Sequence, residues 1–217
     1  MPQAFEYKDL FSTPIWTLDL EPALAEGLNA SLMAEIEALA SPRPVLPPGA
    51  NWQTDPMIHR LPQFADFVGL VERHAAVVAR FLELKSTELV MSGCWANINP
   101  PGGRNSVHSH PNNFLSGSYY VSLPGGHGSI TFDDPRPQAH VMMPPSTCRN
   151  AYNSNVVTLD VKPGRMIFFP AWLSHSVPIN RTGQDRVSIA FNLMFPNYVT
   201  DASPALWRGT VPLAGQS

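Results

Sequence analysis

Residues 107–123 read VHSHPNNFLSGSYYVSL, and the second half of this stretch sets the fold class. Phe114–Leu123 has the composition of a β-strand, and turn clusters such as Pro124-Gly125-Gly126 and Lys162-Pro163-Gly164 separate it from others. The other strand candidates are Cys94–Asn99, Ser129–Phe132, Val156–Val161, Met166–Phe169 and Arg186–Phe195. Short strands at this spacing predict an antiparallel barrel or sandwich.

In the N-terminal part of the chain the apolar residues recur with a different period. Apolar residues recur every three or four positions in Pro22–Ala40 and again in Pro62–Leu84, which predicts two amphipathic helices. Helices that precede the strands indicate an α+β, mainly β, fold with the helices packed on one face of the sheet. We expect one domain over residues 1–217, comprising a helical part (1–86), a β core (87–196) and a tail (197–217) that wraps the surface.

Composition excludes several classes of protein. Charged residues make up 14% of the 217 residues and hydrophobic residues 44%, which argues against a disordered chain. The net charge is −3 and no Lys/Arg cluster is present, so we expect no nucleic-acid partner. Two cysteines are too few for a disulfide framework or a thiolate zinc cage. Without a leader or a long apolar run, we expect a cytoplasmic protein that does not bind a membrane.

Two histidines precede the Phe114–Leu123 strand. His108 and His110 are two positions apart, so on an extended backbone both imidazoles point to the same side, as a divalent transition metal requires. A pair of solvated loop histidines is the simpler alternative. Residues 164–180, GRMIFFPAWLSHSVPIN, add a third candidate, because a buried strand ends at Pro170 and the turn after it can bring His175 to the pair.

An arginine lies on a strand face that should point inward. In Arg186–Asn192 the alternation places Arg186 and Ser188 on one face and Val187 and Ile189 on the other. A buried guanidinium needs a partner, and the carboxylate of a small molecule bound by Arg186 and the Ser188 hydroxyl would supply one. The alternative is an Asp or Glu within the protein.

Three motifs together resemble those of a known superfamily. They are His-x-His-Pro-Asn-Asn-x-x-Ser-Gly-x-Tyr-Tyr-Val from His108, Gly-x-x-x-Phe-Phe-Pro-x-x-x-x-His-x-Val from Gly164, and Arg-x-Ser from Arg186. The combination resembles the Fe(II)- and 2-oxoglutarate-dependent oxygenases, and more narrowly a bacterial and phage branch of that superfamily. The opening Leu10–Trp16 is also similar to that branch, so the resemblance covers most of the chain.

The resemblance implies a fold and a set of roles. The fold would be a double-stranded β-helix, a jelly-roll or cupin-like barrel, with Fe(II) at its open end and 2-oxoglutarate as co-substrate. His175 would match the distal histidine ligand of the superfamily, Arg186 and Ser188 its clamp on the distal carboxylate of 2-oxoglutarate, and Tyr120 a tyrosine that faces the co-substrate. The implied reaction is hydroxylation or demethylation of a small-molecule or side-chain substrate.

The sequence departs from the superfamily at the metal site. The usual His-x-Asp or His-x-Glu is absent, since His110 stands two positions after His108 and Asn112 two after His110. We therefore expect His108, His110 and His175 as ligands, with Asn112 or water as an alternative third ligand. Asp133 and Asp134 are a weaker source of the missing carboxylate, because Asp133-Asp134-Pro135 is typical of a turn.

Several other residues are candidates for the substrate pocket. Trp95, Asn97, Trp172 and Asn192 are expected to line it, together with Phe169. Two other functions remain open: a three-histidine cupin-type dioxygenase or isomerase that uses no 2-oxo acid, and a non-catalytic binding barrel. A homodimer also remains open as the assembly state.

Overall fold

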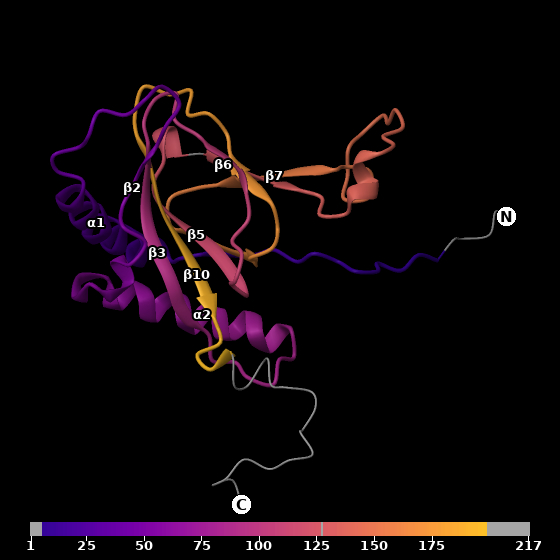
Figure 1. Cartoon of the computed structure of the whole chain (residues 1–217), viewed down its shortest axis with the longest axis horizontal. Coiled ribbons are helices and arrows are strands. Elements are labelled where there is room, and N and C mark those ends of the chain that lie inside the picture. Colours follow the sequence, from indigo (N-terminus) through magenta and orange to yellow (C-terminus); the bar gives the residue numbers. More distant parts are fainter. Residues whose placement is uncertain (1–5, 127, 199–217) are drawn as a thin grey trace, which may run out of the picture.

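The structure is a computed structural model that describes residues 6–126 and 128–198, so all but the first two residues of the expected tail lie outside it. Its α-helices are α1 (Pro22–Leu39) and α2 (Ala65–Phe81). Its strands are β1 (Trp16–Asp19), β2 (Trp52–Gln53), β3 (Val90–Asn99), β4 (Asn105–His108), β5 (Leu115–Ser122), β6 (Gly128–Asp133), β7 (Val156–Val161), β8 (Arg165–Pro170), β9 (His175–Val177) and β10 (Arg186–Met194). The fold is thus mainly β with two helices, as the sequence predicts (Figure 1).

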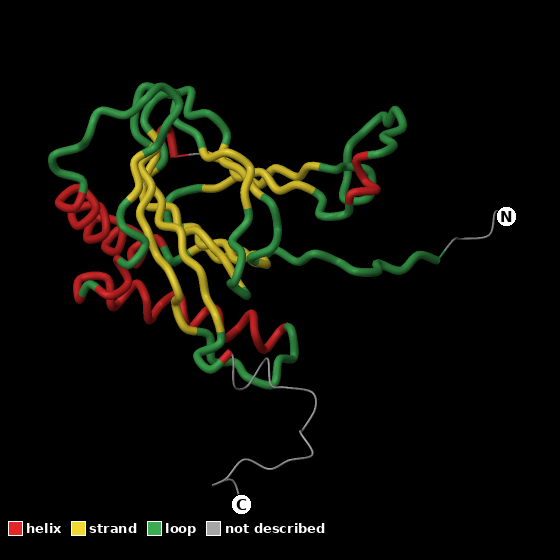
Figure 2. The backbone as a smooth tube through the Cα atoms, viewed as in Figure 1, coloured by secondary structure: helices red, strands yellow, loops and turns green. Residues whose placement is uncertain are grey.

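The strands form two antiparallel sheets. One has six strands in the order β1-β8-β5-β10-β3-β2, and the other has four in the order β4-β9-β6-β7. The sheets are not joined into a closed barrel, which corrects the barrel expected from the sequence (Figure 2). The physical reason is that β4 and β9 are only four and three residues long and pair within their own sheet, so among the described residues each sheet keeps two unpaired edges.

Both helices cover one face of the six-stranded sheet, as expected (Figure 1). Helix α1 buries Leu32 and Ile36, and α2 buries Phe67 and Val71, in a core shared with β3, β5 and β10. The Tyr119 hydroxyl on β5 donates a 2.7 Å hydrogen bond to Asn29 Oδ1 on α1. Both helices end within three residues of the predicted C-terminal ends, and a short 3-10 turn, Pro62–Phe64, precedes α2.

The two faces of the large sheet have different roles because strand residues alternate. Ile189 and Phe191 pack toward the helices, whereas Tyr120 and Ile167 belong to a second core with residues of the small sheet. The sequence did not predict β1, β2, β4 and β9, all of four residues or fewer. Strand β2 matters for the site because it pairs Gln53 with Asn97 on β3.

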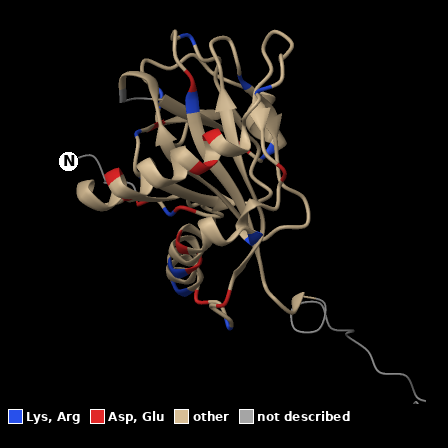
Figure 3. Ribbon diagram, turned by 90° about the vertical axis from the view of Figure 1, so that its left-hand side faces the viewer, with Lys and Arg blue, Asp and Glu red and all other residues tan. Residues whose placement is uncertain are grey.

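The surface charges of the two signs are interspersed along the ribbon (Figure 3). Asp19 accepts hydrogen bonds from Arg165, and Asp134 accepts them from Arg136. None of the helices among residues 6–126 and 128–198 has the length and apolar character needed to cross a bilayer.

Close packing behind the cavity makes Gly117 on β5 a sensitive position. A Cβ atom there would lie 2.4 Å from the Ile167 carbonyl oxygen and 2.4 Å from the Phe191 ring. We expect Gly117→Ala to lower the free energy of unfolding by ~1–3 kcal/mol, the usual cost of overpacking a core. Urea denaturation measures this change.

The matched control is Gly27→Ala on the exposed side of α1, where a Cβ meets nothing within 4 Å. This substitution should stabilise the protein by ~0.5–1 kcal/mol, because alanine is the better helix former. A Gly117→Ala variant as stable as Gly27→Ala would contradict the close contact between β5 and β8.

Candidate metal and co-substrate site

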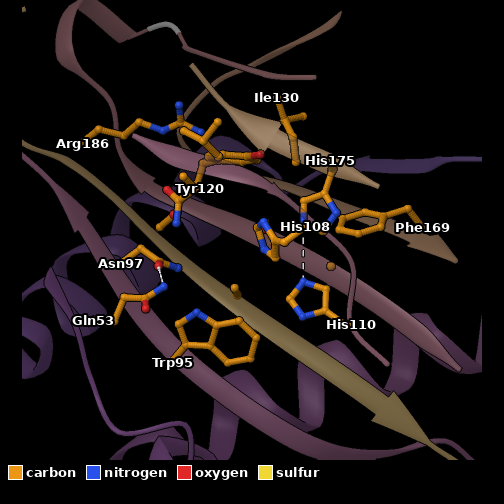
Figure 4. Close-up of a pocket in the computed structure, with 16 residues that line it drawn as sticks. Gln53, Trp95, Asn97, His108, His110, Tyr120, Ile130, Phe169, His175 and Arg186 are labelled. Atoms are coloured by element: carbon orange, nitrogen blue, oxygen red, sulfur yellow. Dashed lines mark hydrogen bonds between the residues drawn. The ribbon is translucent and has the colours of Figure 1, made fainter. Parts of the chain in front are cut away.

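Three histidines, from two neighbouring strands and the loop after one of them, meet at one point. His108 at the end of β4 and His175 at the start of β9 are direct partners in the antiparallel register. His110 follows two residues later, and its backbone N–H donates a 2.9 Å hydrogen bond to the Ala171 carbonyl oxygen, which ties this loop to the turn before β9. One ring nitrogen of each of the three histidines lies within 4.8 Å of the others. The structure therefore brings together the three residues expected as ligands (Figure 4).

The spacing suits a single bound ion. His110 Nε2 lies 3.3 Å from His175 Nε2. Two nitrogens that each sit ~2.1 Å from one metal ion are about 3–3.4 Å apart, so this pair needs almost no movement to bind it. His175 is 5% exposed and His110 is partly buried, while His108 is exposed at the mouth of the cavity.

Backbone carbonyls set the tautomers of two of the rings. His175 Nδ1 lies 3.0 Å from the Leu173 carbonyl oxygen, and His108 Nδ1 lies 2.7 Å from that of Ser106. A carbonyl oxygen only accepts, so each Nδ1 carries the proton and donates it, and each Nε2 keeps its lone pair for a metal. Such outer contacts also fix ring orientation in metal sites.

The site holds the imidazoles of His110 and His175 neutral at pH 7. Burial is the main cause that lowers the pKa of His110 to about 4, with smaller effects from His175 and His108. Burial likewise lowers the pKa of His175 to about 4, although the hydrogen bond to Leu173 opposes the change. Only a neutral imidazole can bind a metal, so both rings are ready to do so at pH 7.

Neither alternative source of a ligand lies in this cluster. The group of His, Cys, Asp and Glu side chains close enough to hold an ion contains the three histidines alone, among the residues that the structure describes. The Asp134 carboxylate is occupied by Arg136, at 3.0 and 2.7 Å. Asn112 is exposed with φ 63°, a left-handed conformation that Asn tolerates, and it does not line the cavity.

The expected carboxylate clamp lies at the other end of the same cavity. Arg186, Ser188 and Tyr120 all line it, and Ser188 is the register partner of Tyr120 across β10 and β5. Arg186 is 6% exposed, and its guanidinium carbon lies 5.6 Å from the centre of the Tyr120 ring. Figure 4 places these two side chains across the cavity from His110.

Two buried polar atoms of this clamp are without partners. Within residues 6–126 and 128–198, Arg186 Nε and the Tyr120 hydroxyl make no hydrogen bond, although the two groups lie close enough to interact electrostatically. Burial lowers the pKa of Arg186 and raises that of Tyr120 to about 12, so both groups remain protonated donors at pH 7. Buried donors without acceptors are costly, and a carboxylate placed between them would satisfy both. The internal Asp or Glu partner that the sequence left open is not found among the described residues.

The other residues that line the cavity are in part those expected from the sequence. Trp95, Asn97 and Phe169 line the cavity, and Trp95 and His110 have ring centres 5.6 Å apart. Gln53, which sequence reasoning missed, also lines it and donates a 2.7 Å hydrogen bond from Nε2 to Asn97 Oδ1. The only early signal for Gln53 was its place after the proline-rich loop.

Two expected pocket residues lie elsewhere. Trp172 is 56% exposed in the turn before β9 and does not line the cavity. Asn192 lies on the predicted face of β10 but beyond the end of the cavity. There the Ser116 hydroxyl donates a 2.7 Å hydrogen bond to Asn192 Oδ1. A strand face thus predicts direction, whereas position along the strand decides whether a side chain reaches the cavity.

The order of motifs and the geometry agree with a comparison of sequences. Residues 93–192, from β3 to β10, match the family described as "Putative 2OG-Fe(II) oxygenase", where 2OG is 2-oxoglutarate. This part of the chain therefore matches a 2OG-Fe(II) oxygenase domain. The matched segment contains the three clustered histidines, Arg186 and Ser188. No curated protein matches the sequence.

Solved structures of oxygenases share the fold of this domain. A Pseudomonas putida prolyl-4-hydroxylase is 15% identical, with 84% of this chain and 93% of that chain covered and a TM-score of 0.55. The epimerase SnoN, in complex with Fe3+, alpha ketoglutarate and nogalamycin RO, is 16% identical (84% and 79% covered, TM-score 0.58). EctD from S. alaskensis, with 2-oxoglutarate and 5-hydroxyectoine, is 18% identical (84% and 72% covered, TM-score 0.57). At such identities the similarity shows the fold alone.

The low pKa values of His110 and His175 predict how the stability of the protein depends on pH. His110 and His175 have folded-state pKa values of about 4 against an ordinary 6.5, so between these values the unfolded chain binds more protons than the metal-free fold. The free energy of unfolding should therefore be highest above pH 6.5 and fall as the pH drops toward 4. Urea denaturation of metal-free protein at a series of pH values measures this dependence.

His175→Gln removes one of the two groups, so its stability should fall less steeply over the same range. Equal slopes for the variant and the parent protein would show that His175 does not resist protonation in the fold.

Proposed function

We propose that the protein is an Fe(II)- and 2-oxoglutarate-dependent oxygenase that hydroxylates or demethylates a small-molecule or side-chain substrate. His108, His110 and His175 would hold the metal, and Arg186, Ser188 and Tyr120 would hold the distal carboxylate of 2-oxoglutarate. The observation that carries the proposal is the pairing, in one cavity, of a three-histidine cluster with two buried donors that lack acceptors.

The donor set fits both groups. Neutral imidazole suits divalent iron, and ligands on one side of the ion leave its other positions open. When bound, Fe(II) and 2-oxoglutarate would supply the oxidative chemistry, with succinate and CO2 as the products of the co-substrate. The relatives that carry Fe3+ or 2-oxoglutarate in their solved structures are consistent with this choice.

The chain's own residues would bind and orient 2-oxoglutarate. The planar guanidinium of Arg186 can grip a carboxylate through two N–H groups, and the Tyr120 hydroxyl adds a third donor. Ser188, their neighbour in the cavity, can add one more hydrogen bond. Trp95 lies beside His110 and Phe169 beside His175 on the cavity wall, and their rings would exclude water from the reacting centre.

One observation favours a second candidate. A ligand set of three neutral histidines, without a carboxylate among the described residues, also suits a cupin-type dioxygenase or isomerase that needs no 2-oxo acid. Such an enzyme has no use for a buried arginine and tyrosine aimed into the cavity. The unpaired donors of Arg186 and Tyr120 therefore favour the 2-oxoglutarate-dependent reaction.

Anaerobic spectroscopy tests the proposal. Adding 2-oxoglutarate to the Fe(II)-loaded protein should produce a visible charge-transfer absorption, because its keto and carboxylate oxygens bind the metal together. Glutarate, which lacks the keto group, is the matched control and should produce none. If 2-oxoglutarate gives no more absorption than glutarate although iron is bound, the cupin-type reaction replaces the proposal.

The third ligand gives a further prediction. His110→Asp would replace a neutral imidazole by the carboxylate that related sites use, so this variant should still bind about one Fe(II) per chain. His110→Ala should lose affinity by at least the ~10–100-fold seen for outer-shell losses. Iron titrations of the two variants measure the difference. Wild-type affinity in His110→Ala combined with metal loss in Asn112→Ala would instead identify Asn112 as the third ligand.

A further inference from the structure

A groove leads from the protein surface to the edge of the histidine cluster. It has a volume of about 520 Å³, within the range of small-molecule sites, ~300–1,000 Å³. Its walls are the loop 48–51 with Gln53 on one side and residues 104–108 on the other. Gln53, Asn105 and His108 line both the groove and the inner cavity, so the groove is an approach to the proposed metal site.

Backbone hydrogen bonds hold the rim of this groove in place. The Gly102 N–H donates a 2.8 Å hydrogen bond to the Asn180 carbonyl oxygen, and the Asn180 N–H donates a 2.9 Å bond back to Gly103. A Cβ at Gly103 would lie 3.0 Å from the Ala50 carbonyl oxygen, so the two walls touch there. Arg104 follows directly, which places its exposed side chain at a defined point of the rim.

The lining carries positive charge only. Arg104 is the one charged residue that lines the groove and Arg186 the one that lines the inner cavity, with no Asp or Glu among the lining residues of either. Arg104 forms no ion pair with any described residue. Three neutral histidines also leave the charge of a bound divalent ion one unit higher than a carboxylate-containing set would. An anion is therefore attracted along the whole path.

An amide pair stands where the groove meets the cavity. Gln53 Nε2 donates to Asn97 Oδ1, which leaves Gln53 Oε1 as a free acceptor and Asn97 Nδ2 as a free donor in the part of the chain described. Asn51 and Asn105 add further side-chain amides to the groove. Together, one free donor and one free acceptor suit the carbonyl oxygen and the N–H of an amide-containing ligand.

From this lining we propose that the substrate of this site is a small anion that also carries an amide, with its carboxylate or similar oxyanion at Arg104 and its amide near Gln53 and Asn97. This inference rests on the proposed function for the reaction and adds the substrate class. Neutral and cationic compounds of the same shape would bind less well.

A matched pair of probes tests the charge preference. N-acetylglycylglycine is an anion with two amide groups, and its C-terminal amide is the neutral counterpart. Ligand-observed NMR measures the binding of each to the full chain loaded with Zn(II) and 2-oxoglutarate, which avoids turnover. At low salt the anion should bind roughly 5-fold more tightly than its amide, and added salt should reduce the difference.

Arg104→Gln should remove this preference, whereas Arg136→Gln should keep it. Arg136 is an equally charged surface residue paired with Asp134 and lies outside the groove. Equal binding of the two probes, no binding of either, or a preference that survives in Arg104→Gln would overturn the inference. Binding of 2-oxoglutarate in the same samples is read separately, so its absence would count against the proposed function and not against the groove.

Discussion

His175→Ala is expected to abolish iron binding by the purified protein. His175 is the most buried of the three clustered histidines, and its Nε2 faces His110 Nε2 at 3.3 Å. With the ring removed, two nitrogens remain, one of them on the exposed His108, and water would compete with them for the ion. Loss of even an outer-shell partner costs ~10–100-fold in affinity, so loss of a direct ligand should cost more.

Metal content after loading with Fe(II) and desalting measures the effect. His140→Ala is the control, because His140 is an exposed histidine held by the Asp134 carbonyl oxygen and Asn155, outside the cluster. Undiminished iron in His175→Ala, or an equal loss in both variants, would remove the basis for the metal site.

Arg186→Lys should weaken 2-oxoglutarate binding by roughly 10- to 150-fold. The lysine keeps the charge but loses the two-pronged donor, and hydrogen bonds to charged groups contribute ~1.5–3 kcal/mol. Ser188→Ala should cost less, near ~1 kcal/mol, because only one hydroxyl is lost. Iron affinity should hardly change in either variant, since neither side chain belongs to the histidine cluster.

Calorimetric titration of the Fe(II)-loaded protein without oxygen measures these affinities. Arg165→Lys provides the control, because Arg165 is held by Asp19 outside the cavity and should leave the affinity unchanged. Equal affinity in the parent protein and in Arg186→Lys would assign the arginine a structural role and favour the cupin-type alternative.

Strand periodicity predicted the parts of the site that depend on local geometry. His108 and His110 were expected to share a side because residues two apart on an extended chain do so, and the structure brings both to His175. The same rule placed Arg186 and Ser188 on the inward face of β10. In each case the information lies within a few consecutive residues.

Other features depend on pairings between distant residues, which periodicity does not encode. Strand β2 is two residues long and leaves no pattern, so Gln53 was missed although it bonds to Asn97. Trp172 sits in a turn, where no repeat sets the direction of a side chain, and it points to solvent. The open edges of the two sheets likewise follow from which strands pair, and not from any one strand.

The most direct test of the central claim is the formation of succinate from 2-oxoglutarate by the purified protein in air. The account predicts succinate that requires added Fe(II), is lost in His175→Ala and is strongly reduced at limiting 2-oxoglutarate in Arg186→Lys. Slow formation is expected even without the true substrate, because all the residues proposed to hold the metal and 2-oxoglutarate line one cavity of this chain. Iron bound by the three histidines with no succinate formed, and no binding of 2-oxoglutarate, would contradict it.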